Sequence, residues 1–147
     1  MSTETKVNVR VARRFDAAPE RVFDAWLDPG TARRWMFATE TGQMVRAEVD
    51  PRVGGRFVFV DRRDGRDVEH VGEYAAIERP RRLDFSFSAD GSPPTPVTVQ
   101  IAPREGGCEL TLTHELHPDW ADYAERTEAG WKKMLDGLAA VLGEGRP

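Results

Sequence analysis

The sequence predicts an α+β fold in which a curved antiparallel sheet of about six or seven strands wraps around one long C-terminal helix. Over residues 119–142, apolar side chains recur at intervals of three and four, as on one face of an amphipathic helix. Over residues 44–114, apolar and polar side chains instead alternate between closely spaced turn signals, which is typical of an antiparallel meander. We assign a single domain to residues 6–143, with flexible ends at 1–5 and 144–147.

The N-terminal part predicts one strand followed by two short helices. Val7, Val9 and Val11 alternate with polar or small residues, which is the period of a half-buried strand. Pro19 suits the first turn of a helix that ends at Asp28-Pro29-Gly30, and Pro29 opens a second short helix running to Trp35. These two helices therefore separate the first strand from the rest of the sheet.

The middle of the chain predicts the remaining strands. They lie near residues 44–49, 56–61, 66–78, 83–87, 97–101 and 110–114. Asp64-Gly65 is a strong signal for a tight hairpin, because both positions tolerate positive φ. The surrounding run 61–66 interleaves arginines with acids and contains no aromatic residue, so we interpret it as a solvated hairpin turn and not as a nucleic-acid surface.

The last helix is predicted to run without interruption from Asp119 to Leu142. Pro118-Asp119 supplies its start signal, and Gly143 stands where a C-cap glycine belongs. Its charged face includes Arg126, Lys132 and Lys133, which we expect on the side away from the apolar stripe. Gly130 and Gly137 share one flank of this helix, where crowding against the sheet, a second subunit or a ligand would each explain a small residue.

The composition of the chain argues against several classes of function. The net charge of −4 and the pI of about 5.4 provide no basic field for nucleic acid or anionic lipid. The single cysteine, Cys108, excludes an internal disulfide framework and suits a reducing compartment. There is neither an apolar run long enough to span a membrane nor a signal-peptide pattern, so we expect a cytoplasmic protein without membrane insertion.

Familiar catalytic and cofactor signatures are absent. The chain has no dinucleotide-binding glycine fingerprint, phosphate-binding loop, nucleophile elbow or zinc-protease motif, so we predict no cofactor. His114 and His117 are three residues apart but straddle a strand end next to Pro118, and we assign no metal site to them. Cys108 is interpreted as a small apolar filler of the core and not as a nucleophile.

The space between the helix and the sheet is the candidate site. Three inward-facing polar residues, His70, Tyr74 and His114, either orient a ligand, act as acid and base, or are simply core residues bonded to backbone. The aromatic side chains around them either line a pocket or fill a core. The full set of pocket candidates is Trp35, Phe37, Phe57, Phe59, His70, Tyr74, Phe85, Phe87, Leu112, His114, Trp131, Met134 and Leu135.

Several motifs occur in this order over about residues 7–142: Phe15–Trp26 with Asp28-Pro29, Trp35, Asp50–Gly55, Gly72–Ile77 with Arg79–Leu83, Thr111–His114 and Gly130-Trp131. Together they resemble the activator-of-heat-shock-protein-90 ATPase homologue-like family of the START and birch-pollen-allergen (SRPBCC) superfamily. The family often has a second tryptophan after the one matching Trp35, where this chain has Met36. The resemblance implies the helix-grip fold, a pocket under the last helix, and homodimers as one arrangement that the sequence leaves open.

We therefore predict a protein that binds a small hydrophobic ligand, of lipid, aromatic or polyketide type, and we assign no catalytic residue. One alternative is a cyclase- or hydrolase-like enzyme that uses the same pocket, which requires an acid–base pair within reach of a ligand. Another is a protein-binding module with a chaperone partner, as the family name suggests, which requires an exposed apolar patch.

Overall fold

The computed structural model describes residues 7–37 and 42–143, and the flexible ends predicted at 1–5 and 144–147 lie outside the described residues. The elements follow the predicted order: one strand, two short helices, six strands and a C-terminal helical segment. The strands are β1 (Val7–Phe15), β2 (Gln43–Val49), β3 (Arg56–Arg63), β4 (Arg66–Glu78), β5 (Arg82–Ala89), β6 (Thr95–Arg104) and β7 (Gly107–Leu116). The predicted α+β class is confirmed.

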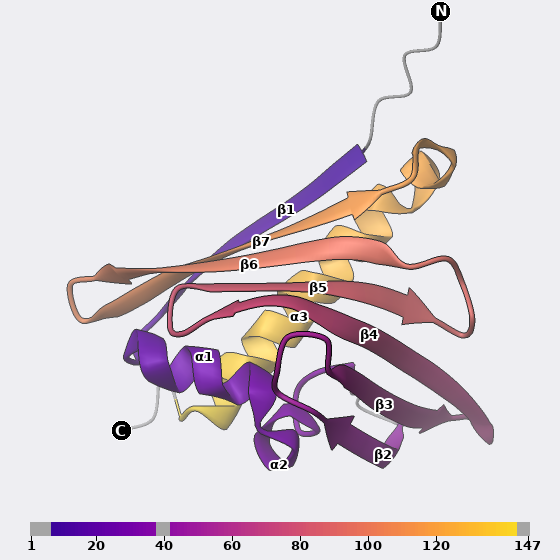
Figure 1. Ribbon diagram of the computed structural model, residues 1–147, viewed down its shortest axis with the longest axis horizontal. Coiled ribbons are helices and arrows are strands. Elements are labelled where there is room, and N and C mark those ends of the chain that lie inside the picture. Colours follow the sequence, from indigo (N-terminus) through magenta and orange to yellow (C-terminus); the bar gives the residue numbers. More distant parts are fainter. Residues whose placement is uncertain (1–6, 38–41, 144–147) are drawn as a thin grey trace, which may run out of the picture.

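The seven strands form one antiparallel sheet in the order β1-β7-β6-β5-β4-β3-β2. Helix α3 (Ala124–Val141) crosses one face of this sheet diagonally, behind β4, β5 and β6 in Figure 1. Helices α1 (Pro19–Leu27) and α2 (Pro29–Ala32) lie along the lower side of the same view. The hydrophobic core fills the layer between the sheet and the helices.

Bulges bend the sheet around α3. The pairing of β2 with β3 shifts register between Met44 and Arg46, and the pairing of β4 with β5 shifts between Tyr74 and Ala76. An extra residue on one strand increases the local twist and bends that strand. The second bulge lies in β4, the longest strand at 13 residues, and curves the sheet near its middle.

Gly72 in β4 allows close packing in the core. A Cβ at this position would lie 2.0 Å from the Ser86 carbonyl oxygen and 2.3 Å from Cε2 of Phe57. Phe57 is the cross-strand partner of Gly72, and its ring is 1% exposed. Glycine is therefore required at this point, because any side chain would displace the ring or the neighbouring strand.

The prediction of one continuous helix from Asp119 to Leu142 is wrong at its start. Residues Pro118–Tyr123 form a 3-10 helix, η1, and α3 begins at Ala124. His117 caps η1: its Nδ1 accepts a hydrogen bond from the Asp119 N–H at 3.1 Å, and its carbonyl accepts one from the Trp120 N–H at 2.8 Å. The C-terminal prediction is confirmed, because Gly143 has a φ of +83° and its N–H bonds to the Ala140 carbonyl.

The hairpin between β3 and β4 is only partly solvated, contrary to the expectation for residues 61–66. Asp64 and Gly65 have φ values of +53° and +77°, as the tight turn requires. Asp61, however, is 1% exposed and accepts a hydrogen bond from Arg63 Nε at 2.8 Å. Residue 61 shares the strand face of Phe57 and Phe59, so the alternation of β3 turns its carboxylate inward.

Candidate ligand-binding site

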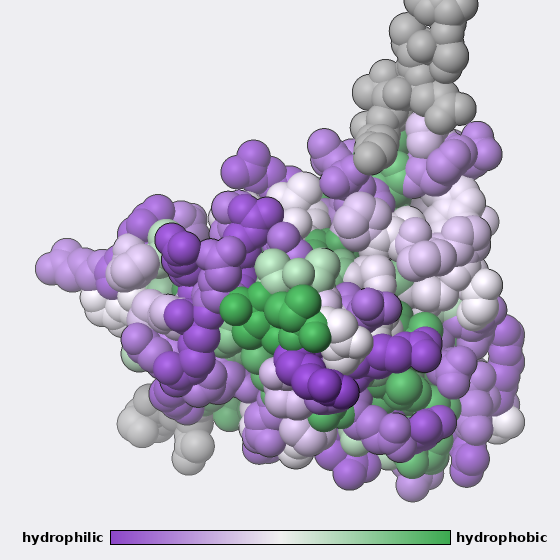
Figure 2. Space-filling view, viewed as in Figure 1, coloured by the Kyte–Doolittle hydropathy of each residue, from purple (hydrophilic) through white to green (hydrophobic). Residues whose placement is uncertain are grey.

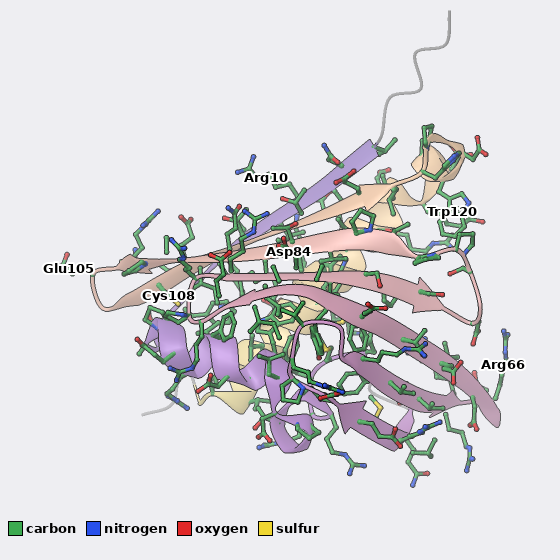
Figure 3. The ribbon with its side chains drawn as sticks, viewed as in Figure 1. Arg10, Arg66, Asp84, Glu105, Cys108 and Trp120 are labelled. Atoms are coloured by element: carbon green, nitrogen blue, oxygen red, sulfur yellow. The ribbon has the colours of Figure 1, made fainter. Side chains whose placement is uncertain are left out.

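A cavity of about 890 Å³ lies between the helical segment and strands β3 to β7. Figure 3 places Trp120 of η1 at the end of the molecule where β5 is joined to β6. Residues of η1 and of the connection between β5 and β6 belong to the wall of the cavity. Small-molecule sites commonly enclose about 300–1,000 Å³. The lining residues are Arg34, Trp35, Phe37, Arg63, His70, Phe87, Ser92, Pro93, Thr95, His114, Leu116, Trp120, Tyr123, Arg126, Thr127, Gly130, Trp131, Lys133, Met134 and Gly137.

The sequence-predicted candidates divide into two groups. Seven of them line the cavity: Trp35, Phe37, His70, Phe87, His114, Trp131 and Met134. The other six, Phe57, Phe59, Tyr74, Phe85, Leu112 and Leu135, are at most 3% exposed and lie in the packed core outside that lining. The strand period alone does not separate the two groups, because both face the helix side of the sheet.

Phe37 is the centre of the aromatic wall. Its ring stacks on His70 at a centroid distance of 4.4 Å and on Phe87 at 5.1 Å, and Trp131 meets it edge-on at 6.0 Å. The Phe37 backbone has a φ of +59°, a conformation that is costly for a bulky residue. Two contacts hold it there: its N–H points to Met134 Sδ at 3.2 Å, and its carbonyl accepts from Arg63 Nη2 at 3.0 Å.

His114 is held in a chain of hydrogen bonds whose proton positions can be assigned. Trp131 Nε1 is only a donor, so His114 Nδ1, 3.1 Å away, must be the acceptor. The proton of the neutral ring is therefore on Nε2, which donates to Thr95 Oγ1 at 2.7 Å, and Thr95 donates in turn to the Phe87 carbonyl. Burial lowers the pKa of His114 to about 4, so the ring is neutral near pH 7 with both nitrogens engaged.

His70 offers the cavity an acceptor. Its Nδ1 lies 3.2 Å from the Phe59 carbonyl oxygen and must donate to it, which leaves the neutral ring with a lone pair on Nε2. Burial lowers the pKa of His70, with the hydrogen bond to Phe59 acting in the opposite direction. Tyr74 is absent from the wall, and burial raises the pKa of its hydroxyl. The three inward polar residues therefore do not converge on one point of the cavity.

Four cationic residues lie around the apolar wall: Arg34, Arg63, Arg126 and Lys133. None of the described lining residues is an aspartate or a glutamate. Arg63 is fixed by Asp61 and the Phe37 carbonyl, while Arg126 lies 5.4 Å from the centre of the Tyr123 ring. Arg34, Arg126 and Lys133 are exposed, whereas the aromatic residues Trp35, Phe37 and Trp131 are buried. Positive charge is thus concentrated at the rim and apolar surface at depth.

One flank of α3 forms part of the wall and contains both of its glycines. A Cβ at Gly137 would make ordinary contact with Trp35 Cβ at 3.5 Å, but a Cβ at Gly130 would meet no atom within 4 Å. Crowding against the sheet therefore does not account for Gly130. Arg126 and Lys133, predicted to face away, lie on the same flank and line the cavity.

Sequence reasoning missed most of the rim. A continuous helix from Asp119 would place Trp120 and Tyr123 on its apolar stripe, whereas the 3-10 geometry of η1 aligns residues three apart. Both side chains line the cavity, and their rings lie 6.3 Å apart. The sequence carries no separate signal for this, because Pro118-Asp119 marks the start of the helical segment in either case.

Comparison with solved structures shows the same architecture in other proteins. Protein CV1439 from Chromobacterium violaceum is 28% identical, with a TM-score of 0.82 over 91% of this chain and 95% of that one. A protein from Rhodobacter sphaeroides is 26% identical, with a TM-score of 0.84 over 99% of both chains. The AHSA1-like protein from Aeromonas hydrophila is 26% identical, with a TM-score of 0.78 over 92% of both. No curated protein matches the sequence.

A family model also matches nearly the whole domain. It is described as Activator of Hsp90 ATPase homolog 1-like protein and aligns with residues 16–143, which include α1, strands β2 to β7 and α3. The resemblance identified from the sequence motifs is therefore confirmed. The chain belongs to the Activator of Hsp90 ATPase homolog 1-like protein family.

Proposed function

We propose that the protein binds a small, largely apolar molecule in the cavity under α3. The observation that carries this proposal is the cavity itself, about 890 Å³ in volume and walled by Trp35, Phe37, Phe87 and Trp131. Protein interiors are normally packed without large voids, so a space of this size lined by aromatic rings is unusual for a core. The open position at Gly130 supports the same interpretation, because glycine in a helix is kept at a cost in stability.

Binding without catalysis fits the polar groups of the wall better than an acid–base reaction does. Both nitrogens of His114 are engaged, by Trp131 and Thr95, and Tyr74 lies outside the lining. His70 keeps an acceptor at Nε2, and the hydrogen bond of its ring in the described part of the chain joins Nδ1 to the Phe59 carbonyl and not to another lining side chain. A cyclase- or hydrolase-like reaction would need a second group within hydrogen-bond reach of the same ligand.

A chaperone-binding surface receives little support from the exposed residues. Among the residues that the structure describes, the exposed large hydrophobic side chains are Val45, Val53 and Tyr123. Tyr123 belongs to the cavity lining, and hydrophilic residues cover most of the face shown in Figure 2, with hydrophobic colour confined to small areas. A docking site for a folded partner normally presents a larger contiguous apolar patch.

The described helices include none that is both long and apolar enough to cross a bilayer.

The first experiment is native mass spectrometry of freshly purified protein, with denaturing extraction of any bound molecule. Binding is then measured with the neutral fluorophore N-phenyl-1-naphthylamine, whose emission rises in an apolar site. Gly130→Leu places a side chain in the cavity, and Ala129→Leu, at an exposed neighbour outside the lining, is the matched control. We expect saturable binding that Gly130→Leu weakens and Ala129→Leu leaves unchanged. Absence of saturable binding, or equal loss in both variants, would refute the proposal.

A further inference from the structure

The charge of the cavity lining is opposite in sign to that of the protein. The chain has 25 acidic and 21 basic residues, a net charge of −4. The described lining nevertheless contains Arg34, Arg63, Arg126 and Lys133 and no carboxylate. These cations come from three separate parts of the fold: the segment after α2, strand β3 and helix α3. Local periodicity in one element therefore does not explain their meeting at one opening.

Arg63 is the anchored member of this group. Its Nε donates to the buried Asp61 carboxylate at 2.8 Å, and its Nη2 donates to the Phe37 carbonyl at 3.0 Å. These two bonds fix the guanidinium plane at the edge of the aromatic wall, since Phe37 itself stacks on His70 and Phe87. A guanidinium held in this way is ordered before a ligand arrives, which reduces the entropy lost on binding.

Arg126 and Lys133 complete the rim on the helix side. They are seven residues apart, two turns of α3, with the open position at Gly130 between them. Both are exposed, so neither pays a large desolvation cost before binding. An anion located over Gly130 would therefore lie between two cations, with its attached apolar part directed toward Trp131.

The deeper wall does not suit a charged group. Trp35, Phe37 and Trp131 are at most 5% exposed. The one N–H group of the neutral His114 ring donates to Thr95 and is not available to a ligand. The free lone pair of His70 is an acceptor and would repel an anion. Charge on a ligand is thus stabilised at the mouth and disfavoured inside.

We infer that the ligand is an amphipathic organic anion, with a carboxylate, sulfonate or phosphate at the rim of Arg34, Arg63, Arg126 and Lys133 and an aromatic or alkyl body against Phe37, Phe87 and Trp131. This inference rests on the proposed function, since it describes the occupant of the same cavity. It adds the orientation of the bound ligand: the head group faces solvent, and the apolar end lies inside the cavity.

The test compares two probes with one aromatic framework, 8-anilinonaphthalene-1-sulfonate and the neutral N-phenyl-1-naphthylamine. Dissociation constants are measured by fluorescence titration of the full chain at low and high salt. The test variant is Arg126→Gln with Lys133→Gln, and the control is Arg10→Gln with Lys132→Gln, which removes two exposed cations outside the lining. Each variant removes two positive charges, so the net charge changes equally, and Lys132 lies beside Lys133 in the sequence and pairs with Glu128. All four positions are exposed, and both variants are expected to fold.

We expect the sulfonate to bind about tenfold more tightly than the neutral probe at low salt and to lose most of this advantage at 1 M salt. The rim variant should weaken sulfonate binding, with each of its two substitutions contributing roughly a two- to fivefold loss, and should leave binding of the neutral probe unchanged. The control variant should change neither constant. If both probes bind equally, or both double variants weaken the sulfonate alike, the anion inference fails while the proposed cavity function stands. If neither probe binds, the proposed function fails as well.

Discussion

Replacing Gly130 with alanine should stabilise this protein, which is uncommon for a substitution in a candidate binding site. Alanine is favoured over glycine in a helix interior by up to about 1 kcal/mol. The added Cβ meets no atom within 4 Å, so no packing penalty offsets this gain. We expect the free energy of unfolding to rise by about 0.5–1 kcal/mol. For a chain of this size, that gain raises Tm by roughly 2–4 °C.

The measurement is urea unfolding followed by circular dichroism, with Ala129→Gly as the reference. Ala129 is an exposed neighbour on α3, so this reverse change should cost about as much as Gly130→Ala gains. If Gly130→Ala is destabilising while Ala129→Gly behaves normally, the position is not open and the cavity is smaller than described. A gain in stability together with weaker ligand binding would show that helix stability is given up at Gly130 to leave room for a ligand.

Two further predictions concern the buried polar network and the core. The folded pKa of His114 is about 4, below its unfolded value near 6.5, so its stabilising contribution is complete above pH 6.5 and is lost as the pH falls toward 4, by up to roughly 3 kcal/mol. Urea unfolding across this range should show a shallower pH dependence for His114→Gln than for the natural protein, and parallel curves would argue against the neutral buried ring. Gly72→Ala should lower the free energy of unfolding by about 3 kcal/mol, because its Cβ would lie 2.0 Å from the Ser86 carbonyl oxygen. Gly137→Ala, with an ordinary 3.5 Å contact, is the control, and equal stability of both variants would contradict the packing described around Phe57.

The fold was predictable because its signals are local and agree with one another. Strand alternation, the Asp64-Gly65 turn and the Gly143 cap each depend on side chains close in sequence, and each is found where the pattern places it. The start of the last helix was not predictable. Apolar periodicity continues through η1, although the backbone hydrogen bonding of η1 starts at His117 with a 3-10 pattern.

The candidate site was only half predictable for a related reason. Alternation identifies which face of a strand turns inward, and on that basis Phe57 and Phe87 are both predicted to line the pocket. In the structure Phe57 packs on Gly72, whereas Phe87 lines the cavity. The rim cations Arg63 and Lys133 carry no sequence signal of their own. Their meeting depends on how far the bulged sheet curves toward α3, which is a property of the assembled layers.

The incomplete closure of the sheet has a consequence for how the molecule avoids aggregation. Among the strands of residues 7–37 and 42–143, β1 pairs only with β7 and β2 pairs only with β3, so two strand edges remain in this part of the chain. Strand β2 has several features that discourage addition of a foreign strand: it is 7 residues long, is interrupted by a bulge, and carries an exposed Arg46–Glu48 ion pair. Irregular pairing therefore has two effects in this sheet. The bulge in β4 bends the sheet around α3, and the bulge in β2, together with the exposed charges there, discourages edge-to-edge polymerisation.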